Sequence, residues 1–369
     1  MAESIWWKQR GTPAVDGALP TGQVNVAVVG AGVTGLTAAL LLARAGLGVV
    51  VLEARHPGAV TTGRTTGKVS ALQGTMLSRM LRAGRRESAA AYVASTLRAQ
   101  EWLAAEADGL GLGLERRPAA TYAPTARATG TVRGEHDAAR DLGLPVRWSD
   151  GPDLPVPAAA ATLLDDQLQL DPGQLVERLL AAALEAGAVV VGDTRVQRVR
   201  QRGDGVHLQV SHGGDEARVS AGRVLLATGA PVVDRRMHFA RVTAQRSYIL
   251  AFDTAGAPET MALSGGGPSR SFRSAEVDGR RILLVGGAGH ETGRGRAENR
   301  RVDELRAWTS EHWPDAVELG AWSAQDYTTT DHLPLVGSLG GASSSVHLAT
   351  GFNKWGLTSG VAAAPQSAR

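Results

Sequence analysis

The stretch "VNVAVVGAGVTGLTAALLLARAGLGVVVLEA", residues 24–54, decides the fold. An apolar run typical of a strand ends at Gly30, and Gly30, Gly32 and Gly35 give the spacing G-x-G-x-x-G. A helix-forming segment follows, and a second apolar run ends at the acidic Glu53. This order predicts a β-α-β unit of the size that binds dinucleotides.

Each position in the motif has a specific physical role. Gly30 permits the tight turn, Gly32 lets a pyrophosphate approach the backbone, and Gly35 lets the helix pack against the sheet. The helix N-terminus offers free N–H groups and a positive dipole end to the phosphates. Glu53 can accept from the ribose hydroxyls and would repel a 2′-phosphate, which disfavours NADP. The motif does not separate FAD from NAD, and a glycine turn in an unliganded α/β protein is the alternative.

Composition limits the other classes of protein. A length of 369 residues predicts two domains, or one large domain with an insertion. The 39 basic and 36 acidic residues nearly cancel, the lysines are only Lys8, Lys68 and Lys354, and aromatic residues make up 4%. No long basic run occurs, so we expect no nucleic-acid partner.

The chain has no cysteine, which excludes disulfides, iron–sulfur clusters and thiolate zinc sites within it. His207 and His212 stand five residues apart without supporting carboxylates, so we expect no metal. The first residues lack a signal-peptide pattern. The uncharged run 26–43 reaches the lower limit for a membrane span, but early glycines and threonines favour a strand–turn–helix. We therefore expect a cytoplasmic protein without a membrane span.

Later parts of the chain carry the resemblance to a known family. A loop rich in glycine and threonine follows Glu53, helical patterns run over 77–110, and another α/β signature begins at Ala186. The blocks that match are "GRTTGKVS" (63–70), "LDDQLQLDPGQLVERLL" (164–180), "LLATGAPVVDRRMHFARVTAQRSYIL" (225–250), "FRSAEVDGRRILLVGGAGHETG" (272–293), "DYTTTDHLPLVG" (326–337) and "HLATGFNKWGLTSG" (347–360). Over nearly its whole length the chain resembles the D-amino-acid-oxidase/glycine-oxidase superfamily of FAD-dependent oxidoreductases. It looks closest to a bacterial branch often fused to a C-terminal Rieske domain, which is absent here.

The resemblance implies an α/β fold in two parts. The first is a Rossmann-like FAD-binding domain, with a parallel sheet and a β-meander, built discontinuously from residues 21–75, 160–235 and 326–369. The second is an inserted α+β substrate domain on an antiparallel sheet, built from residues 76–159 and 236–325. Residues 1–20 are an N-terminal extension.

The resemblance also implies the residues that bind FAD. Gly30, Gly32, Gly35 and Glu53 would hold the ADP half. The expected contacts from the later segments are Arg55, Arg64, Thr65, Thr66, Lys68, Val196, Ala227, Thr228, Gly229, Gly351, Phe352, Lys354, Trp355 and Gly356.

The tail "GFNKWGLTSGVAAAPQSAR", residues 351–369, opens the last expected helix. In the family this helix aims its N-terminus at flavin N1 and the C2 carbonyl. Backbone N–H groups of residues 355–357 and the Lys354 ammonium would there stabilise the negative charge of reduced flavin; a solvated loop lysine is the alternative. Pro365 is expected to end the helix after about two turns, which would leave it thinly packed.

Three residues are candidates for catalysis: Arg273, His290 and Lys354. Arg273 falls where relatives line the substrate side, and an arginine can hold a carboxylate bidentately; the alternative is a sheet arginine paired with Glu276 or Asp278. His290 could accept an amine proton, or it is an ordinary loop histidine.

The resemblance implies an FAD-dependent oxidoreductase that oxidises the C–N bond of a small amine or amino acid by hydride transfer to flavin N5. Its partners would be that substrate and either oxygen or a separate electron acceptor. One alternative is a non-catalytic, degenerate flavin-binding protein with a truncated C-terminal helix. Another is a flavin reductase or electron-transfer protein, for which a second G-x-G-x-x-G is missing.

Overall fold

The segment that decides the fold forms the three expected elements: β1 (Val24–Val29), α2 (Val33–Arg44) and β2 (Val49–Leu52). The two strands lie side by side and parallel, with Val26 opposite Val49. All four residues of β2 are buried, as expected for a strand covered on both faces. The β-α-β prediction is confirmed.

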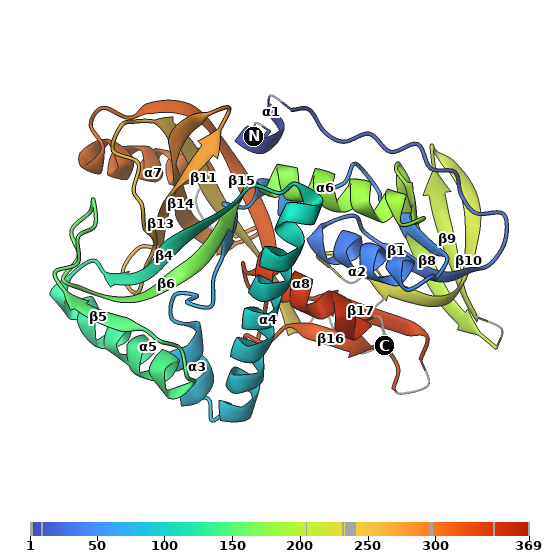
Figure 1. Cartoon of the computed structure of the whole chain (residues 1–369), viewed down its shortest axis with the longest axis horizontal. Helices are drawn as coiled ribbons and strands as arrows, with labels where there is room; N and C mark the ends of the chain where they lie inside the picture. Colours follow the sequence, from blue (N-terminus) through green and yellow to red (C-terminus); the bar gives the residue numbers. More distant parts are fainter. Residues whose placement is uncertain are drawn as a thin grey trace.

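The computed structural model describes residues 3–8, 10–203, 205–230, 232, 241–294, 298–341 and 344–367, with only the backbone described for 365–367. It contains two large sheets, which Figure 1 shows toward opposite ends of the molecule. The expected α/β fold class is therefore confirmed. The division into domains stays a prediction, and its expected boundary at 235/236 lies outside the described residues.

The first sheet is mostly parallel and has a meander attached. Its main path runs in the order β16 (Leu335–Ser338), β17 (Val346–Thr350), β10 (Asp215–Leu226), β1, β2 and β7 (Val189–Val191). The meander adds β8 (Thr194–Arg202) and β9 (Gly205–His212), which pair antiparallel with each other, while β9 also pairs with β10. The parallel strands β1, β2, β10 and β17 align their carboxyl ends at one edge, where such folds bind ligands.

Two apolar layers cover the two faces of this sheet. Val26 and Val28 pack with helices on one face, whereas Ala27 and Val29 pack with the meander on the other. The helices on the first face are α2, α4 (Arg86–Leu110), α6 (Pro172–Glu185) and α8 (Gly356–Ser367). Asp171 caps α6 by accepting from Gly173 N at 2.7 Å, and Pro172 occupies the first helical position.

The second sheet has nine strands and is mostly antiparallel. Its order is β15 (Val317–Thr329), β11 (Val242–Asp253), β14 (Arg280–Glu291), β13 (Arg270–Val277), β12 (Met261–Ser264), β4 (Leu114–Ala123), β6 (Ala160–Leu170) and β3 (Lys68–Val69), with β5 (Arg147–Asp150) beside β6. Helix α7 (Glu298–His312) covers one face through Val302 and Leu305. The other face carries Ile249, Trp322 and the N-terminal Trp6.

The remaining described helices are short or peripheral. Their bounds are α1 (Ile5–Lys8), η1 (Thr62–Arg64), α3 (Met76–Arg82), η2 (Ala126–Ala128) and α5 (Thr129–Asp141). Helix α1 lies between α6 and the second sheet (Figure 1). The three residues Ile5, Trp6 and Trp7 are buried.

Helix α8 corrects one expectation. Its backbone stays helical through Pro365 to Ser367 instead of ending after about two turns. Proline fixes φ near the helical value, and well-packed preceding residues can offset the cost of its missing N–H and of its ring beside the carbonyl four residues earlier. Leu357, Val361 and Ala364 are buried against α2 and α4, and the packing is not thin.

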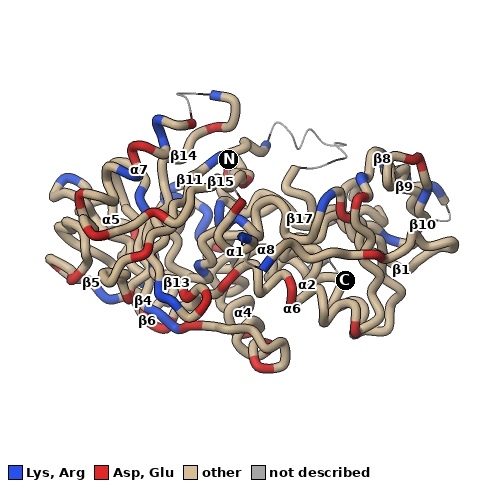
Figure 2. The backbone as a smooth tube through the Cα atoms, turned by 90° about the horizontal axis from the view of Figure 1, so that it is seen from above, with Lys and Arg blue, Asp and Glu red and all other residues tan. Residues whose placement is uncertain are grey.

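Basic and acidic residues are both scattered along the backbone in both halves (Figure 2). Among the described helices, none combines the length and the apolar character that a membrane crossing requires. In the same described residues, no three His, Asp or Glu side chains gather closely enough to hold a metal ion.

Candidate cofactor and substrate site

The glycine turn leaves no room for side chains. Gly30 has φ of +103°, and a Cβ there would lie 2.9 Å from the Ala227 carbonyl oxygen. A Cβ at Gly35 would lie 1.9 Å from the Gly30 oxygen, so only glycine lets α2 approach the turn. Gly32 is the N-cap and offers no side-chain cap, which leaves space before the helix N-terminus.

Glu53 is held at the end of β2 by two backbone amides. One carboxylate oxygen accepts from Ala31 N at 2.8 Å and the other from Arg55 N at 2.9 Å. These bonds fix the carboxylate beside the glycine turn, and each oxygen keeps a second lone pair. Glu53 and Arg55 therefore meet at the edge where the ribose contact is expected.

The loop around η1 adjoins the same turn. Gly58 N donates to Ala31 O at 3.0 Å, and the Thr62 hydroxyl accepts from Val33 N at 3.1 Å. The Thr61 hydroxyl donates to Gln325 O at 2.5 Å, so the loop also contacts β15. It spans from the helix N-terminus to the second sheet. The expected contacts Arg64, Thr65 and Thr66 belong to it, and Lys68 follows on β3.

Lys68, on β3 of the second sheet, is buried and forms no ion pair with any described carboxylate. Its ammonium donates to Ala262 O at 3.2 Å and to the Ser271 hydroxyl. Burial, with nearby Arg273, lowers the pKa of Lys68 to about 7. A lysine close to losing its charge at neutral pH is suited to a site that binds an anion or moves a proton.

The segments that follow β10 and β17 face the glycine turn. Ala227 N donates to Val29 O at 2.9 Å, the Thr228 hydroxyl donates to Ala230 O at 2.6 Å, and Gly229 O accepts from the Thr350 hydroxyl. Val196 is buried in the meander layer, in the same cluster as Leu52 at the end of β2. The structure brings these expected contacts together at one edge of the first sheet.

The tail turns sharply before α8. Gly351, Asn353 and Lys354 have φ of 73°, 49° and 74°, all left-handed. The Asn353 amide locks the turn by accepting from Thr329 N at 3.0 Å and donating to His332 O at 2.8 Å. Two residues later Gly356 begins α8. Phe352 is half-buried and Trp355 is buried in the cluster with α3, so Trp355 is a packing residue.

Lys354 projects over the second sheet. Its ammonium donates to the Ser247 hydroxyl at 2.6 Å and would lie 3.1 Å from a Cβ at Gly289. Asp326 on β15 is 9% exposed, and its Oδ1 accepts from no described residue. Burial raises the pKa of Asp326 to about 6, although the charge of Lys354 opposes the shift.

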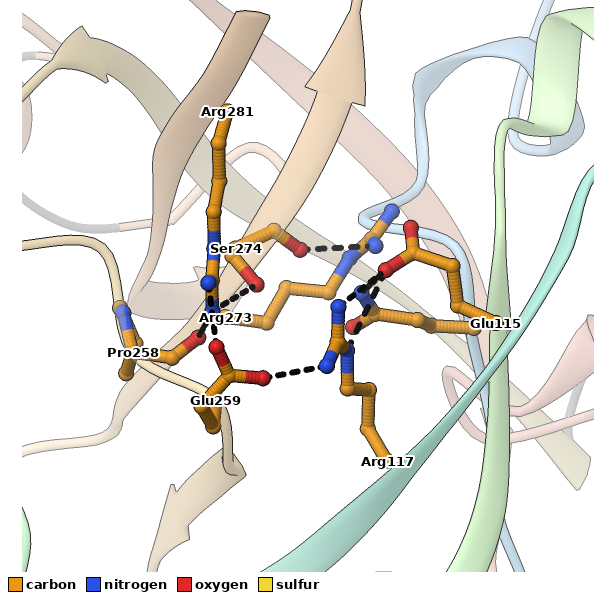
Figure 3. Close-up of polar contacts among 8 residues, drawn as sticks. Glu115, Arg117, Pro258, Glu259, Arg273, Ser274 and Arg281 are labelled. Carbon is orange, nitrogen blue, oxygen red and sulfur yellow. Dashed lines mark hydrogen bonds and ion pairs between the residues drawn. The ribbon is translucent and has the colours of Figure 1, made fainter.

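Arg273 does not face an open site. The side chain is 1% exposed, and it donates to the carbonyl oxygens of Thr66, Ser274 and Leu170. Burial lowers its pKa to about 10. Figure 3 shows it beside the chain of ion pairs in which Glu115 and Glu259 both pair with Arg117 instead. The expected substrate contact is therefore revised, and Arg273 fastens backbone segments.

His290 lies on the far face of the second sheet. Its Nε2 is 3.0 Å from the Tyr248 hydroxyl, and its Nδ1 is 2.8 Å from Glu291 O. Because a carbonyl can only accept, Nδ1 carries the proton and Nε2 accepts from Tyr248. Tyr248 packs beneath α7, opposite the face of Ser247 and Lys354. The structure therefore does not support the expected contact of His290 with flavin or amine.

Three residues near the site escaped the sequence analysis: Asp326, Ser4 and Trp6. Asp326 opens the matched block at 326, and alternation along β15 places it on the face of Trp322 and Ala324. Ser4 and Trp6 belong to the segment treated as an extension.

The comparisons with known proteins agree with this geometry. A family model described as FAD dependent oxidoreductase (DAO) matches residues 25–368. A relative named as the Rieske 2Fe-2S iron–sulfur protein YhfW, of Bacillus subtilis (strain 168), is 27% identical over 375 residues, covering 98% of this chain and 71% of its own length.

Solved structures share the fold at low identity. Glycine oxidase from Geobacillus kaustophilus is 21% identical with a TM-score of 0.75, covering 94% of this chain and 93% of that one. L-Proline dehydrogenase from P. horikoshii is 17% identical with a TM-score of 0.75, covering 94% and 92%. L-Amino acid deaminase from Proteus vulgaris is 15% identical with a TM-score of 0.76, covering 98% and 92%.

The glycine turn, the acid at the end of β2 and the two-sheet fold define a dinucleotide-binding oxidoreductase. The chain belongs to the FAD dependent oxidoreductase family, DAO, and its cofactor is FAD. The residues present fit that cofactor, because the turn is emptied of side chains at Gly30 and Gly32 while Glu53 stands beside it. The expected family, cofactor and enzyme class are confirmed.

Proposed function

We propose that this protein oxidises the C–N bond of a small amine or amino acid. The observation that supports this best is a group of polar side chains on the face of the second sheet that carries Ser247 and Ser271. Lys68 and Lys354 donate to these two serines, and Asp326 stands near Lys354. The names of the structural relatives, an oxidase, a dehydrogenase and a deaminase of amino acids, support the same class of substrate.

FAD, when bound, supplies a two-electron acceptor that takes hydride from the carbon of the C–N bond. Gly30, Gly32 and Glu53 would hold its ADP half, and the loop 63–68 and the tail 351–356 its flavin half. Lys354 and the N-terminal amides of α8 would then stabilise negative charge on the ring. Electrons leave to oxygen or to a separate acceptor.

Asp326 is the proposed proton acceptor. An amine substrate arrives as an ammonium and must lose a proton before its C–H bond becomes a good hydride donor. Asp326 Oδ1 is free of described partners, and its pKa near 6 suits proton transfer at neutral pH. Lys354, held by Ser247, is the cation that would pair with the carboxylate of an amino acid.

The alternative of a non-catalytic, degenerate flavin-binding protein loses its support. That hypothesis depended on a helix that ends at Pro365, whereas α8 runs to Ser367 and packs on α2 and α4. A cytoplasmic location stays a prediction.

The test is anaerobic mixing of the FAD-loaded protein with a panel of amines and amino acids. We expect at least one compound to bleach the visible flavin band, and the Asp326→Asn variant to bleach at least about 100-fold more slowly with it. Dithionite serves as the control for a reducible flavin. A flavin that dithionite bleaches and no amine does would contradict the proposal.

A further inference from the structure

We call the loop around η1, residues 58–67, the cofactor loop. Its five consecutive carbonyl groups from Gly63 to Gly67 are each held by a different donor. The bonds are Ser4 Oγ to Gly63 O at 2.6 Å, Trp322 Nε1 to Arg64 O at 2.8 Å, Trp6 Nε1 to Thr65 O at 2.8 Å, Arg273 Nε to Thr66 O, and Leu170 N to Gly67 O at 3.0 Å. The donors come from the N-terminal segment, from β15 and β13, and from the end of β6.

The four donor side chains are all buried. Ser4 and Trp322 are 0% exposed, Arg273 is 1% and Trp6 is 2%. Hydrogen bonds in such surroundings are stronger than at the surface, and a buried carbonyl left without its donor is destabilising. The loop backbone is therefore firmly oriented.

The N-terminal segment is anchored independently of the loop. Arg10 pairs with Asp171 at 2.7 Å and with Glu177 at 3.1 Å, both on or beside α6. Lys8 donates to Leu319 O at 3.1 Å on β15. Ser4 and Trp6 thus reach the loop from a fixed support.

The held carbonyls determine where the amides point. In a trans peptide the C=O and the following N–H point in opposite directions. The carbonyls of Arg64 and Thr65 point toward Trp322 and Trp6, so the N–H groups of Thr65 and Thr66 point away from these donors. Neither N–H group finds an acceptor among the described residues.

The loop that carries these amides lies in the cofactor site. One end bonds to the glycine turn through Thr62 and Val33, and the other continues into β3 with Lys68. Two unused donors on such a loop are suited to acceptor atoms of a bound cofactor.

We propose that Ser4 and Trp6 are positioning residues of the FAD site. They touch no cofactor themselves. Trp6 orients the 65–66 peptide, which carries the Thr66 N–H, and Ser4 fixes the 63–64 peptide just before the one that Trp322 orients and that carries the Thr65 N–H. Together these bonds hold the Thr65 and Thr66 amides facing bound FAD. This inference depends on the FAD fold and not on the identity of the substrate.

The adjacent residues Trp6 and Trp7 provide a variant and a matched control for testing this proposal. Trp6 and Trp7 are both 2% exposed, and Trp7 also contacts the loop, because a Cβ at Gly63 would lie 2.3 Å from its Nε1. Trp7 Nε1, however, donates to no described residue. Trp6→Phe therefore removes a loop hydrogen bond and ring volume, whereas Trp7→Phe removes only ring volume.

We expect Trp6→Phe to weaken FAD binding, measured by flavin fluorescence on the full-length apoprotein, by about 5- to 30-fold, and Trp7→Phe by less than about threefold. The midpoint potential of the FAD that remains bound should become more negative in Trp6→Phe, because donors to the reduced ring are misplaced. It should stay unchanged in Trp7→Phe. A role confined to folding stability would not move this potential.

Ser4→Ala removes one hydroxyl without a large cavity, and it decides the matter if Trp6→Phe does not fold. It should weaken FAD binding by about 3- to 10-fold and shift the potential in the same direction. Equal losses in both tryptophan variants, or wild-type affinity and potential in Ser4→Ala and Trp6→Phe, would overturn the proposal.

Discussion

At the residue scale, the site depends on ionisable side chains that are buried in the folded protein. Lys68 and Asp326 are both buried, and neither forms an ion pair with a described residue. Burial lowers the pKa of the lysine to about 7 and raises that of the aspartate to about 6. Both groups therefore titrate close to neutral pH, where proton transfer is easiest.

Asp326 makes stability depend on pH in a predictable direction. Its folded pKa of about 6 lies above the ordinary 3.8. Between these values the folded protein keeps a proton that the unfolded chain releases, so its stability falls as pH rises, by about 1.4 kcal/mol per unit. The Asp326→Asn variant cannot ionise at this position, so it escapes this loss. Relative to the wild type, its free energy of unfolding should rise by roughly 1–2 kcal/mol as the pH is raised from about 5 to about 8.

Urea unfolding at those two pH values checks this prediction. Asp331→Asn is the control, because the pKa of Asp331 is lowered by its bonds to Leu333 N and Arg85, outweighing burial. Its titration is complete below the range tested, so its difference from wild type should be the same at both pH values. If the difference in unfolding free energy between Asp326→Asn and the wild type is also the same at both pH values, the raised pKa of Asp326 is refuted.

Single residues were also where the sequence misled most. An arginine at 273 and a histidine at 290 are residue types that often act in catalysis. Which face of the sheet each side chain occupies, however, depends on how the strands pair. Around His290, Ala288 and Gly289 together oppose Ser247 alone, and Ala288 takes φ of 50°. Such a bulge changes the facing of later residues, and simple alternation cannot predict it.

At the scale of elements, the close contact between α2 and α8 links the glycine turn to the tail. A Cβ at Gly360 would lie 2.4 Å from the Thr34 hydroxyl, while its other neighbours are at ordinary distances. Tyr92 reaches Ser359 at 3.2 Å, and Gln73 donates to Thr358 at 3.3 Å, which fixes the start of α8. With Thr34 in place, an alanine at 360 would force its hydroxyl or one of the two helices to shift.

Gly360→Ala should therefore destabilise the protein by about 1–3 kcal/mol, although alanine is the better helix former. The double variant with Thr34→Ala removes the colliding hydroxyl and should recover most of that loss. Thermal and urea unfolding of the two single variants and the double variant give the coupling energy. Additive effects would show that the two side chains do not meet.

Elements with strong local signals could be predicted, and those without could not. Residues 24–54 carry glycine spacing, apolar runs and an acid, all of which act locally, and β1, α2 and β2 follow. Helix α1 has four residues, and Trp6 and Trp7 carry no periodic pattern. Their place beneath the cofactor loop comes from contacts some sixty residues away in sequence, between Ser4 and Gly63 and between Trp6 and Thr65.

At the scale of the whole molecule, the cofactor loop connects the two sheets. It bonds to the glycine turn of the first and to Gln325 on β15 of the second. A cofactor that lies along this loop should stabilise the folded chain as a whole, because it binds the folded state alone.

Removal of FAD should consequently lower the thermal midpoint. At FAD concentrations about 100-fold above Kd, binding adds about 2.7 kcal/mol. Thermal unfolding of apoprotein with and without added FAD measures the shift, with riboflavin, which lacks the ADP half, as the comparison. An identical midpoint with and without FAD would contradict the prediction.

The most direct test of the FAD site is a binding measurement on two glycine variants. Gly32→Val places a branched side chain before the helix N-terminus, where even a Cβ would lie 3.1 Å from the Thr62 hydroxyl. Gly22→Val makes the same change ten residues earlier, where a Cβ meets nothing within 4 Å. We predict that titration with FAD shows wild-type affinity for Gly22→Val and at least about 100-fold weaker binding for a folded Gly32→Val. Wild-type affinity in Gly32→Val would contradict the location of the cofactor.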